Sequence, residues 1–412
     1  MRYTSLDALR GFALLGLPFL NIISFSMPFA TYLNPYAYQG DSLLNHVIFS
    51  FIQVVGDQKF YGIFSILFGA SIIMLCEKAK SRHQGEFRAY GKRMFWLFVI
   101  GLLHLFLLWE GDILSTYAIV GLLVFLFRDL SIQACTFICL LLIACSTVLN
   151  LQLDLEPIDL SQSDFAGLRA MYLPTSEDID NVIQAMRGSY DSVMSATSWA
   201  SSDQDFVIGD TYLINMGTAS LLKIASLMML GMILFKSGVL LGQRGRELYK
   251  KMACYGIALG YISTLLIVVW LYSNQYDANL YFSYGAGLLS LSTYITTVGY
   301  VGLVCWLIKS ARATRFINTI KPVGRLALTN YLSQSLLCAL IFYGYGIGAF
   351  GSFNRVELLL TAISIGIAQI GFSHLWLNYF AQGPIEWLWR RLSGTKLPQP
   401  EAEIEVENTN SK

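Results

Sequence analysis

Long apolar stretches follow one another along almost the whole of this 412-residue chain. Each of about ten stretches can cross the hydrocarbon of a bilayer, which takes roughly 20 helical residues. They lie near residues 11–30, 46–76, 94–110, 112–128, 131–150, 217–241, 252–272, 284–308, 324–346 and 356–380. Only 13% of the residues are charged, against roughly 25% in a soluble domain. We therefore expect an all-α, polytopic integral membrane protein whose main partner is the lipid bilayer.

Lysine and arginine are confined to alternate loops between these stretches. The basic loops are 77–93, 242–251 and 309–323. The loops without Lys or Arg are 31–45, 272–283 and 347–354. Short loops rich in Lys and Arg stay in the cytoplasm. About ten spans with both termini cytoplasmic put every basic loop on that side, so we expect a multi-pass protein of the bacterial inner membrane.

The same pattern divides the chain into four parts. Residues 1–150 are expected to form an N-terminal membrane bundle of about five helices, and residues 217–392 a C-terminal bundle of about five. Between them, residues 151–216 form an acidic loop on the extracytoplasmic side. Residues 393–412 lack aromatic residues after Pro398 and are expected to be a disordered cytoplasmic tail.

Charge and cysteine spacing argue against several kinds of partner. The formal net charge is +1, whereas a nucleic-acid-binding protein normally carries a basic patch. The seven cysteines lie in or beside apolar runs, without a CxxC pair or Cys/His spacing. They are typical of small buried hydrophobic residues. We therefore expect no nucleic-acid partner, no metal site and no disulfide framework.

His104 and two carboxylates form the clearest group of polar residues in an apolar setting. His104 lies about ten residues into the third stretch, and Glu110 and Asp112 sit at the hairpin that follows. On a straight helix His104 would lie roughly 9–12 Å from these carboxylates, too far for direct contact. An imidazole at that depth suits a general base or a proton relay. The alternative is a hydrogen bond to a neighbouring helix that serves packing alone.

Two further charge pairs require an explanation. Asp57 and Lys59 interrupt the second stretch, which predicts a broken helix lining a cavity. The alternative is a short loop just outside the bilayer. Asp7 and Arg10 are one helical turn apart at the inner edge of the first stretch, where an i, i+3 pair accounts for both.

A stripe of polar side chains marks the ninth stretch, in the motif GRLALTNYLSQS. It includes Asn330 and Gln334 at i, i+4 spacing, and Arg325 opens the same motif. Amides at this depth either hold helices together or line a hydrated pocket. We keep both interpretations, and count these three residues as candidates for substrate binding.

Five segments together resemble the YeiB family of bacterial inner-membrane proteins, which contain a domain of unknown function (418). They are LDALRGFALLGLPFLNI, KFYGIFSILFGA, LLHLFLLWEGDILSTYAIVG, GRLALTNYLSQS and QGPIEWLWRRL. The resemblance runs in order over nearly the whole chain. It implies a helical membrane protein with a broadly described role in transport.

A more distant resemblance is to membrane-embedded acyltransferases. Many of those have an Arg, then ten other residues, and then a His, whereas here the residue at that distance from Arg10 is Asn21. The lysosomal glucosaminide acetyltransferases are more similar because they also have Asn there, followed by an active His, an Asp and an apolar run ending in Gly. His46, Asp57 and Gly69 fill those places with different spacings. The resemblance thus implies His46 as an acyl carrier, and His104 is the rival candidate.

Three functions remain open from the sequence. The first is transport of a small molecule or lipid through a polar cavity inside the membrane. The second is an acyltransferase-like enzyme that moves an acyl group from a cytoplasmic donor, such as acyl-CoA, to an extracytoplasmic acceptor. The third is a non-catalytic membrane partner protein. The catalytic candidates are His104, His46, Asp112 and Glu110, and the substrate-binding candidates are Arg10, Asn21, Asp57, Lys59, Arg325, Asn330 and Gln334.

Overall fold

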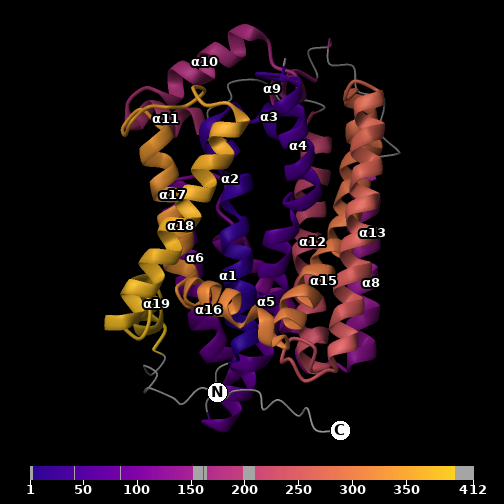
Figure 1. Cartoon of the computed structure of the whole chain (residues 1–412), viewed down its shortest axis with the longest axis vertical. Helices are drawn as coiled ribbons and strands as arrows, with labels where there is room; N and C mark the ends of the chain where they lie inside the picture. Colours follow the sequence, from indigo (N-terminus) through magenta and orange to yellow (C-terminus); the bar gives the residue numbers. More distant parts are fainter. Residues whose placement is uncertain are drawn as a thin grey trace.

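Helices make up the ordered secondary structure of the chain (Figure 1). The computed structural model describes residues 3–40, 42–83, 85–151, 161, 165–197 and 209–394, and these residues form no β-strand. The first half contains α1 (Thr4–Gly16), α2 (Pro18–Ser26), α3 (Ala30–Leu33), α4 (Leu43–Val55), α5 (Lys59–Ser81), α6 (Glu86–Leu107), α7 (Leu114–Phe125), α8 (Ile132–Leu151), α9 (Ala166–Tyr172), α10 (Ser176–Met186) and α11 (Tyr190–Thr197). The second half contains α12 (Gly209–Lys236), α13 (Arg246–Ser273), α14 (Ala278–Leu280), the π-helix η2 (Tyr281–Gly285), α15 (Ala286–Ile308), the 3₁₀-helix η3 (Ala311–Ala313), α16 (Thr314–Arg325), α17 (Ala327–Phe342), α18 (Arg355–Tyr379) and α19 (Pro384–Leu392).

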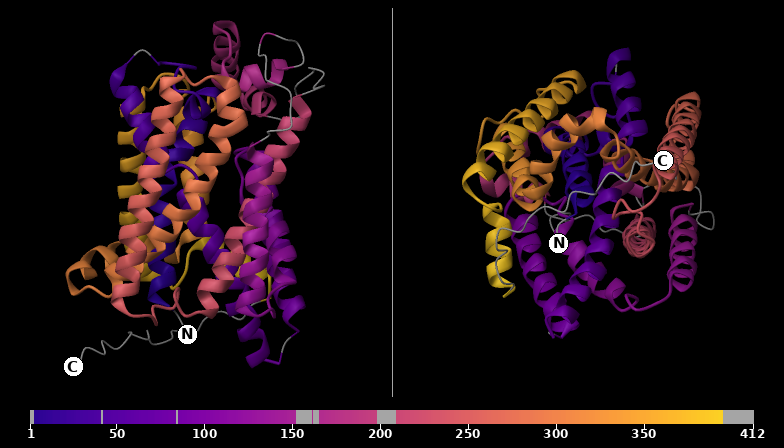
Figure 2. Two further views of the ribbon diagram at one scale, coloured as in Figure 1. Left: turned by 90° about the vertical axis from the view of Figure 1, so that its right-hand side faces the viewer. Right: turned by 60° about the horizontal axis from the view of Figure 1, so that its bottom comes forward.

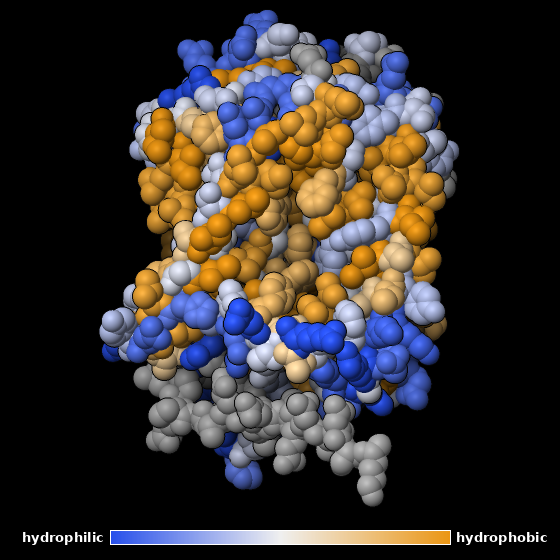
Figure 3. Space-filling model, viewed as in Figure 1, coloured by the Kyte–Doolittle hydropathy of each residue, from blue (hydrophilic) through white to orange (hydrophobic). Residues whose placement is uncertain are grey.

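The described part of the chain has eight helical segments long and apolar enough to cross a membrane. They are Thr4–Ser26, Leu43–Ser81, Glu86–Leu107, Ile132–Leu151, Ile214–Lys236, Arg246–Ser273, Ala278–Ile308 and Arg355–Tyr379. The shorter apolar helices α7 and α17 occupy the two remaining predicted stretches. The all-helical prediction is confirmed. Hydrophobic side chains dominate the visible face between two more hydrophilic ends (Figure 3).

The predicted break in the second stretch is confirmed. Helix α4 ends at Val55 and α5 begins at Lys59. Between them Gln58 has a φ of 59°, in the left-handed region that a continuing α-helix does not use. The break frees carbonyl groups that need new donors. The Lys59 Nζ donates to the Gln53 carbonyl at 2.6 Å, and the Tyr300 hydroxyl donates to that of Val55 at 2.6 Å.

The connections rich in Lys and Arg lie at one end of the helix bundle. Figure 1 places the α5–α6, α12–α13 and α15–α16 connections at one end of the bundle, together with the start of α1 and helix α19. These are the connections predicted to be rich in Lys and Arg. Helices α3, α9, α10 and α11 lie at the opposite end. The first and last described helices are therefore at the same end, as an even number of crossings requires.

Two connecting segments are more ordered than the sequence suggested. The basic loop 309–323 is mostly helix α16, which runs across the bundle and packs on α1 (Figures 1 and 2). The acidic loop 151–216 contains α9, α10 and α11, and Gly188 lies between the last two. Residues 152–160, 162–164 and 198–208 of the acidic loop, and nearly all of the tail 393–412, lie outside the described residues.

Helices of the two predicted bundles pack directly on each other, since α1 contacts α16 and α5 contacts α12. The α5–α12 crossing depends on two glycines. A Cβ at Gly69 would lie 1.8 Å from the Met228 carbonyl oxygen, and one at Gly231 would lie 1.9 Å from that of Ile66. The two backbones are thus in contact, as small residues permit between helices in a bilayer.

Replacement of Gly69 by Ala should therefore destabilise the protein. We expect Gly69→Ala to lower the free energy of unfolding by about 2 kcal/mol, because the added methyl group forces the helices apart. Gly371→Ala is the matched control, since no atom lies within 4 Å of its added Cβ. Thermal unfolding of the two detergent-solubilised variants measures the difference. Equal melting temperatures would contradict the close crossing.

Candidate functional site

The imidazole of His104 and the carboxylate of Asp112 form a buried pair. The His104 Nδ1 lies 2.9 Å from Asp112 Oδ1, and the two side chains are 1% and 0% exposed. The other carboxylate oxygen accepts from the Ser115 amide at 2.8 Å and from its hydroxyl at 2.7 Å. Asp112 is thus fixed by α7 and in turn orients the imidazole on α6.

The expected separation of 9–12 Å between His104 and the carboxylates is wrong for Asp112, because the helix does not continue that far. Helix α6 ends at Leu107, and the amides of Leu108 and Trp109 both donate to the His104 carbonyl. The chain reverses there, and Asp112 returns beside His104. Gly101, one turn earlier, makes room, since a Cβ would lie 2.9 Å from Asp112 Oδ2 and 2.4 Å from the Ser115 nitrogen.

This pairing leaves one imidazole nitrogen free. With Nδ1 donating to Asp112, the Nε2 of His104 carries a lone pair, and within the described residues this buried atom has no hydrogen-bond partner. The ring lies 5.3 Å from that of Tyr331, centroid to centroid. A carboxylate-oriented imidazole with a free Nε2 is the arrangement of a general base.

His46 is in a different situation. Its Nδ1 lies 3.1 Å from the Tyr272 hydroxyl, and its Nε2 lies 2.6 Å from the Gly40 carbonyl. Both ring nitrogens are therefore engaged, and the ring also packs on Tyr36 and Tyr272. His46 therefore joins α4 to α13 and to the loop that precedes α4.

A second polar group gathers around the α4–α5 break. Asp57 accepts a hydrogen bond from Tyr32 and one from the Gln58 amide at 3.3 Å. Lys223 of α12 donates from Nζ to Gln58 Oε1 at 2.5 Å and to the Ser290 carbonyl at 3.3 Å. Lys59 and Lys223 are both 2% exposed. In the described part of the chain neither lysine forms an ion pair with a carboxylate within 4.0 Å, so the group holds two basic side chains and one acidic one.

Tyrosine side chains connect helix α7 of the His104 group with the helix break. The Tyr117 hydroxyl lies 2.9 Å from both the Ser65 hydroxyl and the Tyr61 carbonyl. The Tyr61 hydroxyl in turn donates to Gln58 Oε1 at 3.4 Å, the same oxygen that accepts from Lys223. Hydrogen bonds therefore join α7, the helix that carries Ser115 of the His104 group, to the break and to α12.

The polar stripe of α17 mainly connects helices. The Gln334 amide donates to the Leu14 carbonyl at 3.0 Å and to Gln369 Oε1 at 2.6 Å. The Asn330 amide donates to the Val323 carbonyl at 3.2 Å and to Ser373 at 2.9 Å. These contacts join α17 to α1, α16 and α18, so the interpretation as helix-to-helix contacts accounts for the stripe.

The other predicted residues lie outside these groups. Arg10 forms the predicted pair with Asp7, at 3.2 Å. Arg325 donates to the Ala381 carbonyl at 3.3 Å, and Asn21 is partly exposed on α2. A substrate-binding role for these residues stays a prediction.

Comparison with known proteins places the chain in a family. The family described as "Protein of unknown function (DUF418)" matches residues 234–396. "Uncharacterized protein YeiB" of Escherichia coli (strain K12) is 32% identical over 400 residues, covering 95% of this chain and 96% of that protein. The chain belongs to the YeiB family. "Uncharacterized protein YxaH" of Bacillus subtilis (strain 168) is 28% identical over 403 residues, covering 93% and 92%.

Two buried cations of this YeiB-family chain, Lys223 and Arg355, were not predicted from the sequence. Lys223 is a single charge inside a long apolar stretch, which is itself a signal of a functional or strongly bonded residue. Arg355 directly follows the loop 347–354, just before the last apolar stretch. Its burial became visible only with the packing of α18 against α2 and α4.

Glu110 lies in the hairpin outside the long helices, and its carboxyl should make the stability of the protein depend on pH. Burial raises the pKa of its carboxyl to about 7, whereas the pKa of Glu in an unfolded chain is about 4.3. The unfolded chain thus loses this proton first, and the folded state loses stability as the pH rises from about 4.3 to about 7. We expect Glu110→Gln to melt at a higher temperature than the native protein at pH 8, and at the same temperature at pH 4.

The exposed Glu247 offers a matched control, because Glu247→Gln changes the same charge without burial. Its melting-temperature difference from the native protein should not vary with pH. A Glu110→Gln difference that is also constant between pH 4 and pH 8 would rule out the raised pKa.

Proposed function

We propose that the chain is a multi-pass protein of the bacterial inner membrane, with ten spans and both termini in the cytoplasm. Eight long apolar segments and two shorter ones supply the spans. The loops with most Lys and Arg share one end of the bundle, which the positive-inside rule assigns to the cytoplasm. His104 lies near the opposite, extracytoplasmic end of α6.

Within this topology, the best-supported function is that of a membrane-embedded acyltransferase with His104 as general base. The observation that carries it is the oriented His104–Asp112 pair with its unpartnered Nε2. A histidine used only for packing would be expected to bond through both nitrogens, as His46 does, because unpaired buried polar atoms are costly. Glu110 and Asp112 belong to the same hairpin, and Asp112 acts by positioning the imidazole.

The proposed step is a balanced transfer. Nε2 of His104 takes the proton of an acceptor hydroxyl, whose oxygen attacks the carbonyl of a thioester donor of the acyl-CoA class. The new C–O bond forms, the C–S bond breaks, and the thiolate leaving group takes the proton back from the imidazolium. The acyl group ends on the extracytoplasmic acceptor, and the donor is released as a free thiol.

Two substitutions test this role. We expect His104→Gln and Asp112→Asn each to lower the rate of transfer at least about 100-fold, the usual contribution of a general base. Asp112→Asn keeps the shape, but the amide can present its own N–H to Nδ1 and so favour the wrong tautomer. The measurement is thiol release from acetyl-CoA by proteoliposomes supplied with total bacterial lipid and sugar extract.

His374→Gln, which alters a surface histidine, is the control and should leave the rate unchanged. The proposal is overturned by a native protein that releases no thiol above empty liposomes. It is equally overturned by His104→Gln and Asp112→Asn proteins that retain native rates.

Transport is the second candidate, favoured by the positive group at the helix break. Lys59 and Lys223 are buried near a single aspartate, Asp57. A broken helix whose freed groups face a polar interior is a common substrate site in transporters. The excess positive charge there favours an anionic substrate, such as a small anion or a lipid headgroup.

For transport we expect Lys223→Met to lower the rate at least tenfold, because it removes the cation while keeping the length of the side chain. The measurement follows fluorescent phosphatidylglycerol in proteoliposomes as dithionite quenches the label on the outer leaflet. Lys250→Met, an exposed lysine, is the matched control. A native protein with no exchange above empty liposomes would exclude lipid translocation.

A further inference from the structure

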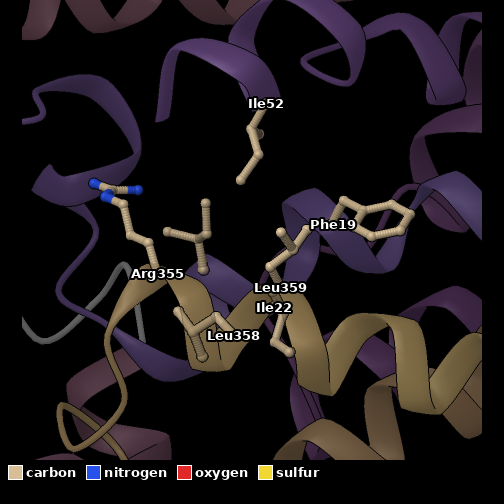
Figure 4. Close-up of a pocket in the computed structure, with 7 residues that line it drawn as sticks. Phe19, Ile22, Ile52, Arg355, Leu358 and Leu359 are labelled. Atoms are coloured by element: carbon tan, nitrogen blue, oxygen red, sulfur yellow. The ribbon is translucent and has the colours of Figure 1, made fainter. Parts of the chain in front are cut away.

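An apolar crevice lies between helices α2, α4 and α18. The crevice is shallow and open on one side, and its empty space, with the open side included, is about 200 Å³. Figure 4 shows Arg355 at one end and Phe19 at the other, with Ile22, Leu358 and Leu359 between them. The full lining is Phe19, Ile22, Ile23, Ile52, Arg355, Leu358 and Leu359. Six of these seven side chains are hydrocarbon, so the crevice suits an aliphatic chain.

The exception, Arg355, is a buried cation with unused bonding capacity. Its side chain is 2% exposed. Nη2 donates to the Thr31 carbonyl at 2.8 Å, and the guanidinium carbon lies 5.0 Å from the Phe49 ring centroid. Nη1 is buried without a hydrogen-bond partner, and among the described residues no carboxylate forms an ion pair with this guanidinium. A guanidinium in this state is suited to a phosphate or carboxylate.

The position of Arg355 along the bundle gives the ligand an orientation. It is the first residue of α18, a helix of 25 residues that is long enough to cross a bilayer. Arg355 therefore lies at the level of lipid headgroups, and Leu358 and Leu359 lie one turn deeper. Figure 3 shows the visible face hollowed among hydrophobic side chains, and Figure 1 places α2, α18 and α4 around the upper part of that face.

We propose that the crevice binds one anionic phospholipid, with its phosphate on Arg355 and part of an acyl chain along α18. The head and the tail then have the same order along the membrane normal as in the surrounding bilayer. The hydrocarbon lining accounts for the chain, and the uncompensated guanidinium accounts for the negative head. This site is separate from the His104 pair and requires neither proposed activity.

The test measures lipid binding to the purified full-length chain in detergent by native mass spectrometry. Phosphatidylglycerol and phosphatidylcholine with identical chains are titrated separately. The native protein is expected to bind phosphatidylglycerol at least tenfold more tightly. Arg355→Gln should reduce that preference at least fivefold, whereas Arg187→Gln, which removes an exposed cation near the same end, should leave it unchanged.

A second pair of variants tests the proposed binding of the acyl chain and leaves Arg355 unchanged. Leu359→Trp fills the crevice and should weaken phosphatidylglycerol binding at least fivefold. Leu360→Trp changes the exposed neighbour, which does not line the crevice, and should have no effect. Gel filtration establishes that each variant is folded, and the Leu359/Leu360 comparison decides the question if Arg355→Gln is not recovered.

Several outcomes would overturn the proposal. They are equal affinity for the two lipids, equal losses in Arg355→Gln and Arg187→Gln, and equal losses in Leu359→Trp and Leu360→Trp. Competition separates the sources of negative charge. Displacement of the lipid by inorganic phosphate alone would mean a headgroup site without a chain, and preferential retention of oleate would mean a fatty-acid site.

Discussion

The break between α4 and α5 is the constraint around which the interior of this bundle is arranged. A helix interrupted among apolar neighbours leaves carbonyl groups that water cannot reach, and each unpaired group costs free energy. Lys59 and Tyr300 donate to two of those carbonyls. Lys223 reaches the same region from α12 through Gln58. The need to satisfy one broken helix thus brings polar side chains of α4, α5, α12 and α15 together in the middle of the protein.

The need to bond buried polar groups also explains the His104 pair, which lies at the end of α6. Early termination of the helix at Leu107 allows Asp112 to return, and its carboxylate satisfies both the imidazole and the first turn of α7. Both carboxylate oxygens of Asp112 accept hydrogen bonds here, and the Nε2 of His104 has no partner among the described residues. Both ring nitrogens of His46 are engaged, whereas His104 keeps Nε2 for a substrate proton, which is why we weigh His104 above His46.

The sequence predicted the features that depend on local pattern. Apolar runs predicted the helices, and the polar residues after Gly56 predicted the break. The contacts of His104 were not predictable in this way, because they depend on where α6 ends and on the space that Gly101 leaves beside α7. The crevice was harder still, since α2, α4 and α18 come from distant parts of the chain. The sequence of α18 alone does not indicate that Arg355 is buried against α2 and α4.

The balance of buried charge links the separate groups. Asp112 is stabilised by hydrogen bonds from His104 and Ser115, and Glu386 by the first amides of α17. Asp57 remains near two lysines, and Arg355 has no carboxylate among the described residues. Buried charge without a counter-charge is expensive. Because basic side chains outnumber acidic ones at both places, an anionic ligand would relieve the cost in each.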